Sequence, residues 1–208
     1  MSDRAAAIDG FLAAAGWQDA RRDPLPGDAS FRRYVRLERG GARAMLMDAP
    51  PPREDVRPFL HVARLLQAMA LSAPGIHAID TEAGLLLLED FGDDTYTRLL
   101  AAGADESDLY ALAVDVLIAL VRQFRPDQGA GVPPYDDERL LAEAALLVDW
   151  YLPALTGAPT APALREDYLA LWRRLLPLAR VVPETLVLRD YHVDNLMRLD
   201  GRDGIAAC

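Results

Sequence analysis

The sequence predicts an α+β protein with a small antiparallel sheet in its first part and helices in its second. Residues 31–47 and 76–88 contain short runs rich in β-branched, aromatic and leucine residues, separated by turn signals. After residue 105, apolar residues recur at helical spacing in three segments. With 208 residues, of which 51% are hydrophobic and 26% charged, the chain is expected to form one large core or two small ones.

The first part is expected to alternate helix and strand pairs. Gly40-Gly41 supplies the positive φ of a tight hairpin, and Pro58 is tolerated only in the first turn of a helix. The expected elements are a helix over Asp3–Ala15, a hairpin of Phe31–Leu37 with Ala42–Met47, a helix over Asp55–Met69, and a strand pair of Ile76–Ile79 with Leu85–Leu88.

Three helices are expected in the second part. The first, over residues 109–124, is predicted to be a buried central helix, and the others cover Glu138–Tyr151 and Ala163–Leu176. The apolar stripes of the last two, which include Leu164, Leu171 and Leu175, are interpreted as core rather than as a cofactor site.

Composition excludes several classes of function. A net charge of −10 argues against a broad nucleic-acid surface, because phosphate affinity depends on clustered cations. All 22 basic residues are Arg, so Schiff-base chemistry and a Walker lysine are excluded. The single cysteine, Cys208, cannot form an internal disulfide, and no apolar run approaches a membrane span. The protein is expected to be soluble and cytoplasmic, without a membrane partner, and its oligomeric state is not predicted.

The segment "LVLRDYHVDNLMRL" holds the candidate catalytic residues. Asp190 is expected to follow a strand over Leu186–Leu188, and Asn195 to precede a strand over Leu196–Leu199. In phosphoryl transfer, an Asp in such a loop accepts the proton of the attacking hydroxyl, and an Asn five residues later binds the metal. The alternative is that both side chains only make turns with the backbone.

Four motifs carry a family resemblance over residues 8–208: "GDASFRRY", "MDAPP", "LLLEDFGDDTY" and "LRDYHVDNLM". Together they resemble the aminoglycoside phosphotransferase-like kinases, and within them the bacterial anomeric kinases of N-acetylmuramate and N-acetylglucosamine in cell-wall recycling. The resemblance implies a protein-kinase-like two-lobe fold. Residues 1–90 would form the nucleotide-binding lobe and residues 91–208 a helical lobe with the catalytic loop. It also implies ATP and Mg²⁺ as cofactors and a small amino sugar as substrate.

The resemblance assigns roles to individual residues. Asp190 is the catalytic base and Asn195 a metal ligand, while the side chains of Asp90 and Asp93 are open candidates for a ribose hydroxyl. The residues expected to bind nucleotide are Ser30, Phe31, Arg32, Arg33, Glu89 and Phe91, and those expected to bind the acceptor are Arg189 and His192.

Two positions depart from the family pattern. Met47 stands where a phosphate-binding Lys is expected, which leaves Arg32, Arg33 or Arg43 as substitutes, and Leu188 stands where the catalytic loop has a His.

The family pattern places a second metal-binding Asp beyond Cys208. It would follow a strand pair of residues 196–199 and 205–208, whose turn contains Asp200 and Asp203. The helical lobe is therefore expected to be incomplete, and the 208-residue chain alone to be inactive. Two alternatives stay open: a non-catalytic nucleotide-binding module, or a kinase of the same fold that acts on an aminoglycoside, choline or another small alcohol. A cationic acceptor would need an acidic pocket, for which the candidates are Asp136, Asp137, Glu138 and Glu143.

Overall fold

The computed structural model describes residues 3–27, 30–199 and 201–202. The chain divides into two compact units. The first consists of the residues up to Gln128 together with those from Leu188 onward, and the second of residues 129–187. The predicted lobe boundary at residue 90 stays a prediction. None of the helices formed by the described residues is both long and apolar enough to cross a membrane.

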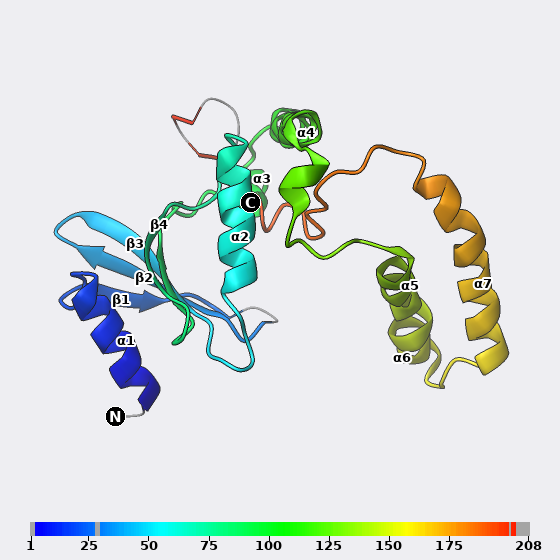
Figure 1. Cartoon of the computed structure of the whole chain (residues 1–208), viewed down its shortest axis with the longest axis horizontal. Helices are drawn as coiled ribbons and strands as arrows, with labels where there is room; N and C mark the ends of the chain where they lie inside the picture. Colours follow the sequence, from blue (N-terminus) through cyan, green and yellow to red (C-terminus); the bar gives the residue numbers. More distant parts are fainter. Residues whose placement is uncertain (1–2, 28–29, 200, 203–208) are drawn as a thin grey trace. The chain divides into compact units, whose positions relative to one another are not determined.

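The first unit contains a five-stranded antiparallel sheet (Figure 1). The strand order is β1-β2-β3-β5-β4. The strands are β1 (Arg21–Pro24), β2 (Arg33–Arg39), β3 (Ala42–Asp48), β4 (Ile76–Asp80) and β5 (Leu85–Leu88). The predicted hairpin and the second strand pair are confirmed, with positive φ at Gly40 and Gly41 in the turn. Strand β1 was not predicted, because the segment "RRDP" is polar and exposed throughout, as suits a short edge strand.

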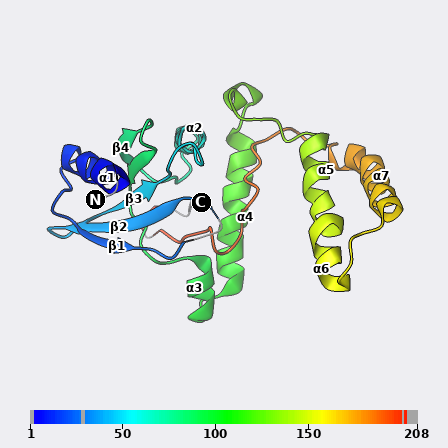
Figure 2. The same ribbon diagram turned by 90° about the horizontal axis from the view of Figure 1, so that it is seen from below.

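Two helices cover opposite faces of this sheet (Figures 1 and 2). Helix α1 (Asp3–Ala14) packs on the face that carries Leu37, Leu46 and Leu87. Helix α2 (Arg57–Ala68), with Pro58 in its first turn, packs on the face that carries Met47 and Leu86. Because neighbouring strand residues point to opposite faces, the Leu-rich run of β5 is buried on both sides.

An ion pair ties α1 to β3. Asp48 is the buried charged residue among those described, and the Arg4 guanidinium donates a hydrogen bond from Nε to Asp48 Oδ1 at 2.9 Å. Arg4 also donates to the carbonyl of Ala83. Removal of the Arg would leave a carboxylate in the core without its partner.

We expect Arg4→Met to lower the free energy of unfolding by about 2–4 kcal/mol, because an unpaired buried charge retains its desolvation cost. The matched control is Arg22→Met, which removes the exposed ion pair between Arg22 of β1 and Asp9 of α1. That control should cost at most about 1 kcal/mol. Urea denaturation of both variants tests the difference, and equal losses would contradict the structural role of Arg4.

The helices after the sheet in the first unit are α3 (Tyr96–Ala101) and α4 (Glu106–Gln123). Asp105 caps α4 by accepting hydrogen bonds from the amides of Ser107 and Asp108. The predicted helix is confirmed as α4, but the expectation of a buried central helix holds for one face only. Leu109 and Ala113 are buried against α3 and the loop after Arg189, whereas Val114 and Val121 on the other face are exposed.

The second unit is helical and begins after the short 3-10 turn of Pro126–Gly129. It contains α5 (Asp137–Leu146), a π-helical turn η2 (Leu147–Tyr151), α6 (Leu152–Thr156) and α7 (Pro162–Ala179). The two predicted helices are confirmed. The interpretation of their apolar stripes as core is wrong for Leu164, Leu171 and Leu175, which are exposed. Helix α7 packs on α5, and the Tyr168 hydroxyl donates to the Ala144 carbonyl at 3.1 Å. Leu169 and Leu176 are the buried residues of α7, so its apolar face is wider than its buried part.

Candidate active site

The predicted catalytic loop is a tight turn, which hydrogen bonds between its own residues stabilise. The side-chain amide of Asn195 donates to the carbonyl oxygen of Asp190 at 2.9 Å, and the backbone amide of Asn195 donates to the carbonyl of His192. The side chains of Asp190 and Asn195 are both exposed. The spacing of five residues thus brings the Asn side chain back to the backbone of the predicted base.

The loop is not flanked by strands, so the expectation of strands over Leu186–Leu188 and Leu196–Leu199 is wrong for the described residues. A strand requires a partner, and the partner expected for the second run lies at residues 205–208, outside the described residues together with Asp200 and Asp203. Met197 instead forms an isolated antiparallel bridge with Thr95.

The start of α3 provides most of the support for the loop. The backbone amides of Tyr96 and Thr97 donate to the carbonyls of Leu196 and Val193 at 2.9 and 3.2 Å. The Thr97 hydroxyl donates to the carboxylate of Asp194. Tyr191, whose hydroxyl donates to the Ala113 carbonyl at 2.8 Å, anchors the loop to α4. Sequence reasoning did not find Thr97, because its contact arises only when α3 folds against a loop nearly a hundred residues away.

His192 lies between two other loop residues. Its Nε2 is 3.2 Å from the side-chain amide nitrogen of Asn195, and its Nδ1 is 3.6 Å from Asp194 Oδ2. The ring is half exposed. His192 therefore contacts two other residues of the loop and keeps one edge of its ring exposed.

Arg189 precedes the candidate base in a left-handed backbone conformation, with φ of 60°. This conformation is uncommon for a residue with a Cβ atom and is often found at functional sites, where its strain serves the geometry. The side chain of Arg189 is exposed.

Glu54 holds the segment of Ser30, Phe31 and Arg32, which the sequence predicts to bind nucleotide. One carboxylate oxygen of Glu54 accepts from the backbone amide of Phe31, and the other accepts from Arg32 Nε at 3.1 Å. Arg53 lies over the ring of Phe31, 5.0 Å from its centroid. The amide of Arg32 donates to the Ser30 hydroxyl, which places all three predicted nucleotide-binding residues of this segment in one local arrangement.

The other two arginines considered for phosphate binding are exposed. Arg33 opens β2 opposite Asp48, and Arg43 lies in β3 opposite Glu38. Met47, at the position expected for a Lys, is fully buried in the α2-facing core. The substitution of a phosphate-binding Lys by Arg32, Arg33 or Arg43 stays a prediction.

Glu89 and Phe91 lie in the linker between β5 and α3. Glu89 accepts a hydrogen bond from the Gly75 amide at 3.0 Å and one from Arg202. Burial alone would raise the pKa of Glu89, but these two hydrogen bonds outweigh it and hold the pKa below its usual value. Arg202 also lies over the Phe91 ring, 5.2 Å from its centroid. The carboxylates of Asp90 and Asp93, considered for a ribose hydroxyl, both bind Arg36.

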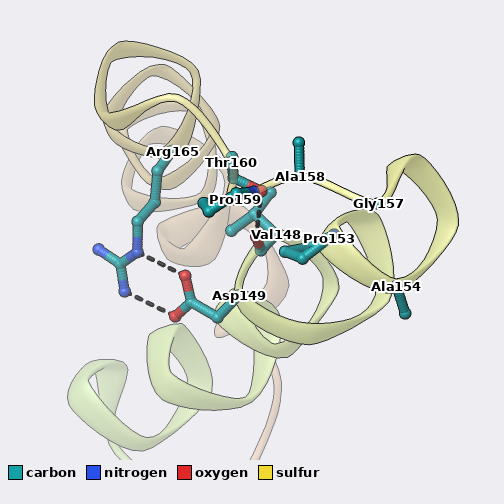
Figure 3. Close-up of a pocket in the computed structure, with 9 residues that line it drawn as sticks. All are labelled: Val148, Asp149, Pro153, Ala154, Gly157, Ala158, Pro159, Thr160 and Arg165. Atoms are coloured by element: carbon teal, nitrogen blue, oxygen red, sulfur yellow. Dashed lines mark hydrogen bonds and ion pairs between the residues drawn. The ribbon is translucent and has the colours of Figure 1, made fainter.

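A separate pocket lies in the helical unit and contains none of the predicted site residues (Figure 3). It is an open hollow of about 660 Å³. Arg165 forms two hydrogen bonds with the Asp149 carboxylate on one side, and Thr160 donates to the carbonyl of Val148 at its base.

No group of three His, Cys, Asp or Glu side chains suited to a metal occurs within the part of the chain that the structure describes. The side chain of Asn195 can supply one oxygen ligand to a metal. Its amide nitrogen donates to the Asp190 carbonyl, and that hydrogen bond does not use its amide oxygen. Mg²⁺ commonly takes only one or two protein ligands and completes its shell with phosphate and water oxygens.

Comparisons with known proteins identify relatives along most of the chain. Residues 22–207 match the model of the phosphotransferase enzyme family. The N-acetylmuramate/N-acetylglucosamine kinase of Pseudomonas aeruginosa is 42% identical over 204 residues, which cover 94% of this chain and 57% of the relative. The kinase of the same name from Caulobacter vibrioides is 36% identical, over 99% of this chain and 65% of the relative. The one from Neisseria meningitidis is 31% identical, over 86% of this chain and 53% of the relative. The chain thus spans between half and two thirds of the length of these proteins.

A solved structure shows the same fold. The streptomycin–ATP–APH(2")-IIa ternary complex matches with a TM-score of 0.59 at 12% sequence identity, over 98% of this chain and 68% of that one. The likeness confirms the predicted protein-kinase-like α+β fold.

Proposed function

Since the chain belongs to the phosphotransferase enzyme family, we propose that it transfers the γ-phosphoryl group of ATP to the anomeric hydroxyl of N-acetylmuramate and N-acetylglucosamine. The shared name of relatives from three genera supports this acceptor class. The observation that supports the proposal most directly is the hydrogen bond from the Asn195 side chain to the backbone carbonyl of Asp190, in an exposed loop. The reaction would serve peptidoglycan recycling in the cytoplasm.

Asp190 acts as the proton acceptor in this proposal. Its exposed carboxylate hydrogen-bonds the anomeric hydroxyl, orients it for in-line attack and takes its proton as the new O–P bond forms. The bond between the γ-phosphorus and the β,γ-bridging oxygen breaks in the same step, and ADP leaves. Asn195 holds Mg²⁺, which when bound neutralises charge on the phosphates. Ser30, Phe31, Arg32 and Arg33 cover the phosphates, while the backbone of Glu89–Phe91 binds the adenine.

The acidic residues considered for a cationic acceptor are mostly engaged. Asp136 caps α5 through the amide of Arg139, Asp137 pairs with Arg180, and Glu143 accepts from the hydroxyl of Tyr135. The ion pair with Arg180 offsets the negative charge of Asp137, so the amino-sugar acceptor is favoured over the cationic one.

The direct test assays the protein as its gene encodes it with ATP, Mg²⁺ and each acceptor, and examines the product by ³¹P NMR. The expected product is a sugar phosphate whose phosphorus couples to the anomeric proton. Turnover of choline or an aminoglycoside, but of neither sugar, would establish the alternative substrate class. Nucleotide binding without any turnover would establish a non-catalytic module.

Arg189 is expected to distinguish the two sugars, because only N-acetylmuramate carries a carboxylate for a guanidinium to bind. Arg189→Gly should raise the KM for N-acetylmuramate about 10-fold, the loss of one charge-assisted hydrogen bond, and leave the KM for N-acetylglucosamine nearly unchanged. Gly also suits the positive φ at this position, so the loop should keep its shape. Arg189→Ala, which removes the charge and keeps the backbone strain, is the companion variant. Equal changes in both KM values would rule out this role.

A further inference from the structure

Every N–H donor of Arg36 is used inside the first unit. From the middle of β2, its Nε donates to Asp90 Oδ2 at 2.7 Å. One terminal nitrogen donates to Asp90 Oδ1 at 3.1 Å and to the Gly92 carbonyl at 2.8 Å. The other terminal nitrogen donates to both carboxylate oxygens of Asp93 at 3.0 Å. Since a guanidinium has five N–H groups, no donor is left over for a ligand. We call Arg36, Asp90, Gly92 and Asp93 the Arg36 cluster.

Arg36 and Asp90 are shielded from water, whereas Asp93 lies at the exposed edge of the cluster. The side chain of Arg36 is 15% exposed and that of Asp90 only 2%. Burial opposes the charge of Arg36, but the hydrogen bonds and charges of Asp90 and Asp93 prevail and hold its pKa above the usual value. The Arg36 hydrogen bond likewise lowers the pKa of Asp93. Desolvation of such ions is costly and is recovered only when the geometry satisfies all of them, as it does here.

The effect of the cluster is to fix the linker between β5 and α3 in one conformation. Asp90 Oδ1 accepts from the Gly92 amide at 2.9 Å as well as from Arg36, so it closes a turn within the linker. Gly92 adopts a φ of 84°, which a residue with a Cβ atom rarely reaches. The backbone of residues 89–92 is therefore oriented by a side chain that lies 54 positions earlier in the sequence.

Arg36 also shares a face with the α2-side core. Tyr34, two residues before it, packs against the cluster that contains Met47 and Leu88, and alternation along β2 places Arg36 on that same face. Its partner across the hairpin is Met45.

We propose that Arg36 is a positioning residue for nucleotide binding, which holds the backbone of the Glu89–Gly92 linker in the conformation that binds the adenine ring. The inference rests on the proposed function, which assigns base recognition to this linker. It adds a residue on another strand that contacts no phosphate and no acceptor, and that acts through Asp90 and Asp93.

The test compares Arg36→Lys with wild type by steady-state kinetics. Lys retains the charge, but its ammonium group has three N–H donors and cannot replace the five hydrogen bonds that the Arg36 guanidinium makes. The KM for ATP should rise about 10-fold, as expected when a charge-assisted network is left partly unmade. The kcat at saturating ATP and the KM for the sugar should stay within about threefold, because neither the base nor the acceptor contacts change. Inhibition by inorganic triphosphate, which has no base, should be unaffected.

Two further variants separate positioning from general damage. Asp93→Asn affects an exposed member of the cluster and should raise the KM for ATP in the same direction without unfolding the protein. Arg21→Lys alters the exposed pair of Arg21 with Glu38 on the neighbouring strand and should change nothing. An unchanged KM for ATP in both cluster variants would overturn the inference, as would a weakened triphosphate inhibition of the same size. Failure of the wild type to bind ATP would overturn the proposed function, and this inference with it.

Discussion

Asp190→Asn is expected to lower kcat by about 10²–10⁴-fold, the contribution of a positioned general base, while the Kd for ATP changes by less than about threefold. The backbone of residue 190 holds the loop, since its amide donates to the Leu188 carbonyl at 2.8 Å and its carbonyl accepts from Asn195. Asn retains both bonds. Only the proton acceptor is lost, so single-turnover assays should lose the chemical step and retain nucleotide binding.

Asp194→Asn is the matched control on the same loop. Its carboxylate accepts from Thr97, and an amide oxygen can still accept that bond, so turnover should fall by less than about 10-fold. Near-wild-type turnover by Asp190→Asn would show that another group accepts the proton. A loss in Asp194→Asn as large as that in Asp190→Asn would shift the assignment to Asp194.

Gly84→Ala is expected to be the most destabilising small substitution in the sheet. A Cβ atom at Gly84 would lie 2.1 Å from the carbonyl oxygen of Ala49 and 3.0 Å from Pro51 Cδ, and Gly84 has a φ of 65°. Ala49 cannot move away without cost, since its amide donates to the Gly84 carbonyl at 2.9 Å. Overpacking and the left-handed backbone together should lower the free energy of unfolding by about 3 kcal/mol or more.

Gly41→Ala isolates the backbone contribution. Gly41 has a φ of 83°, but no atom lies within 4 Å of the position that a Cβ atom would occupy, so only the conformational strain of about 1–2 kcal/mol should appear. Urea denaturation followed by circular dichroism, with amide exchange in β5 as a local probe, compares the two variants. Similar losses for both would mean that the contact with Ala49 relaxes freely.

The regular elements could be predicted from the sequence because their signals are local. The Gly40-Gly41 turn, the alternation in β2 and β3 and the 3.6-residue period of α4 each depend on neighbours within a few positions. The edge strand β1 lacked such a signal, because its pairing with β2 leaves all four side chains exposed. The strands expected around the catalytic loop did not form among the described residues, and Leu196 of the second run packs on α3 and α4 instead.

The site was predictable only where a single short segment carries it. The D-x-x-x-x-N spacing puts Asp190 and Asn195 on one loop, and in the structure a hydrogen bond joins the Asn side chain to the Asp190 carbonyl. Arg36 and Thr97 gave no sequence signal, since their partners lie 54 or more positions away and become neighbours only through tertiary packing.

The attachment of the catalytic loop to α3 has a consequence for how the sequence can drift during evolution. Residues 193 and 196 take part through their carbonyl oxygens, which every amino acid supplies, so their side chains can vary within the limits of packing. Tyr191 and Thr97 take part through hydroxyl groups. A library that randomises the loop and α3 under selection for growth should therefore accept apolar exchanges at Val193, but at position 97 should retain only Thr and Ser.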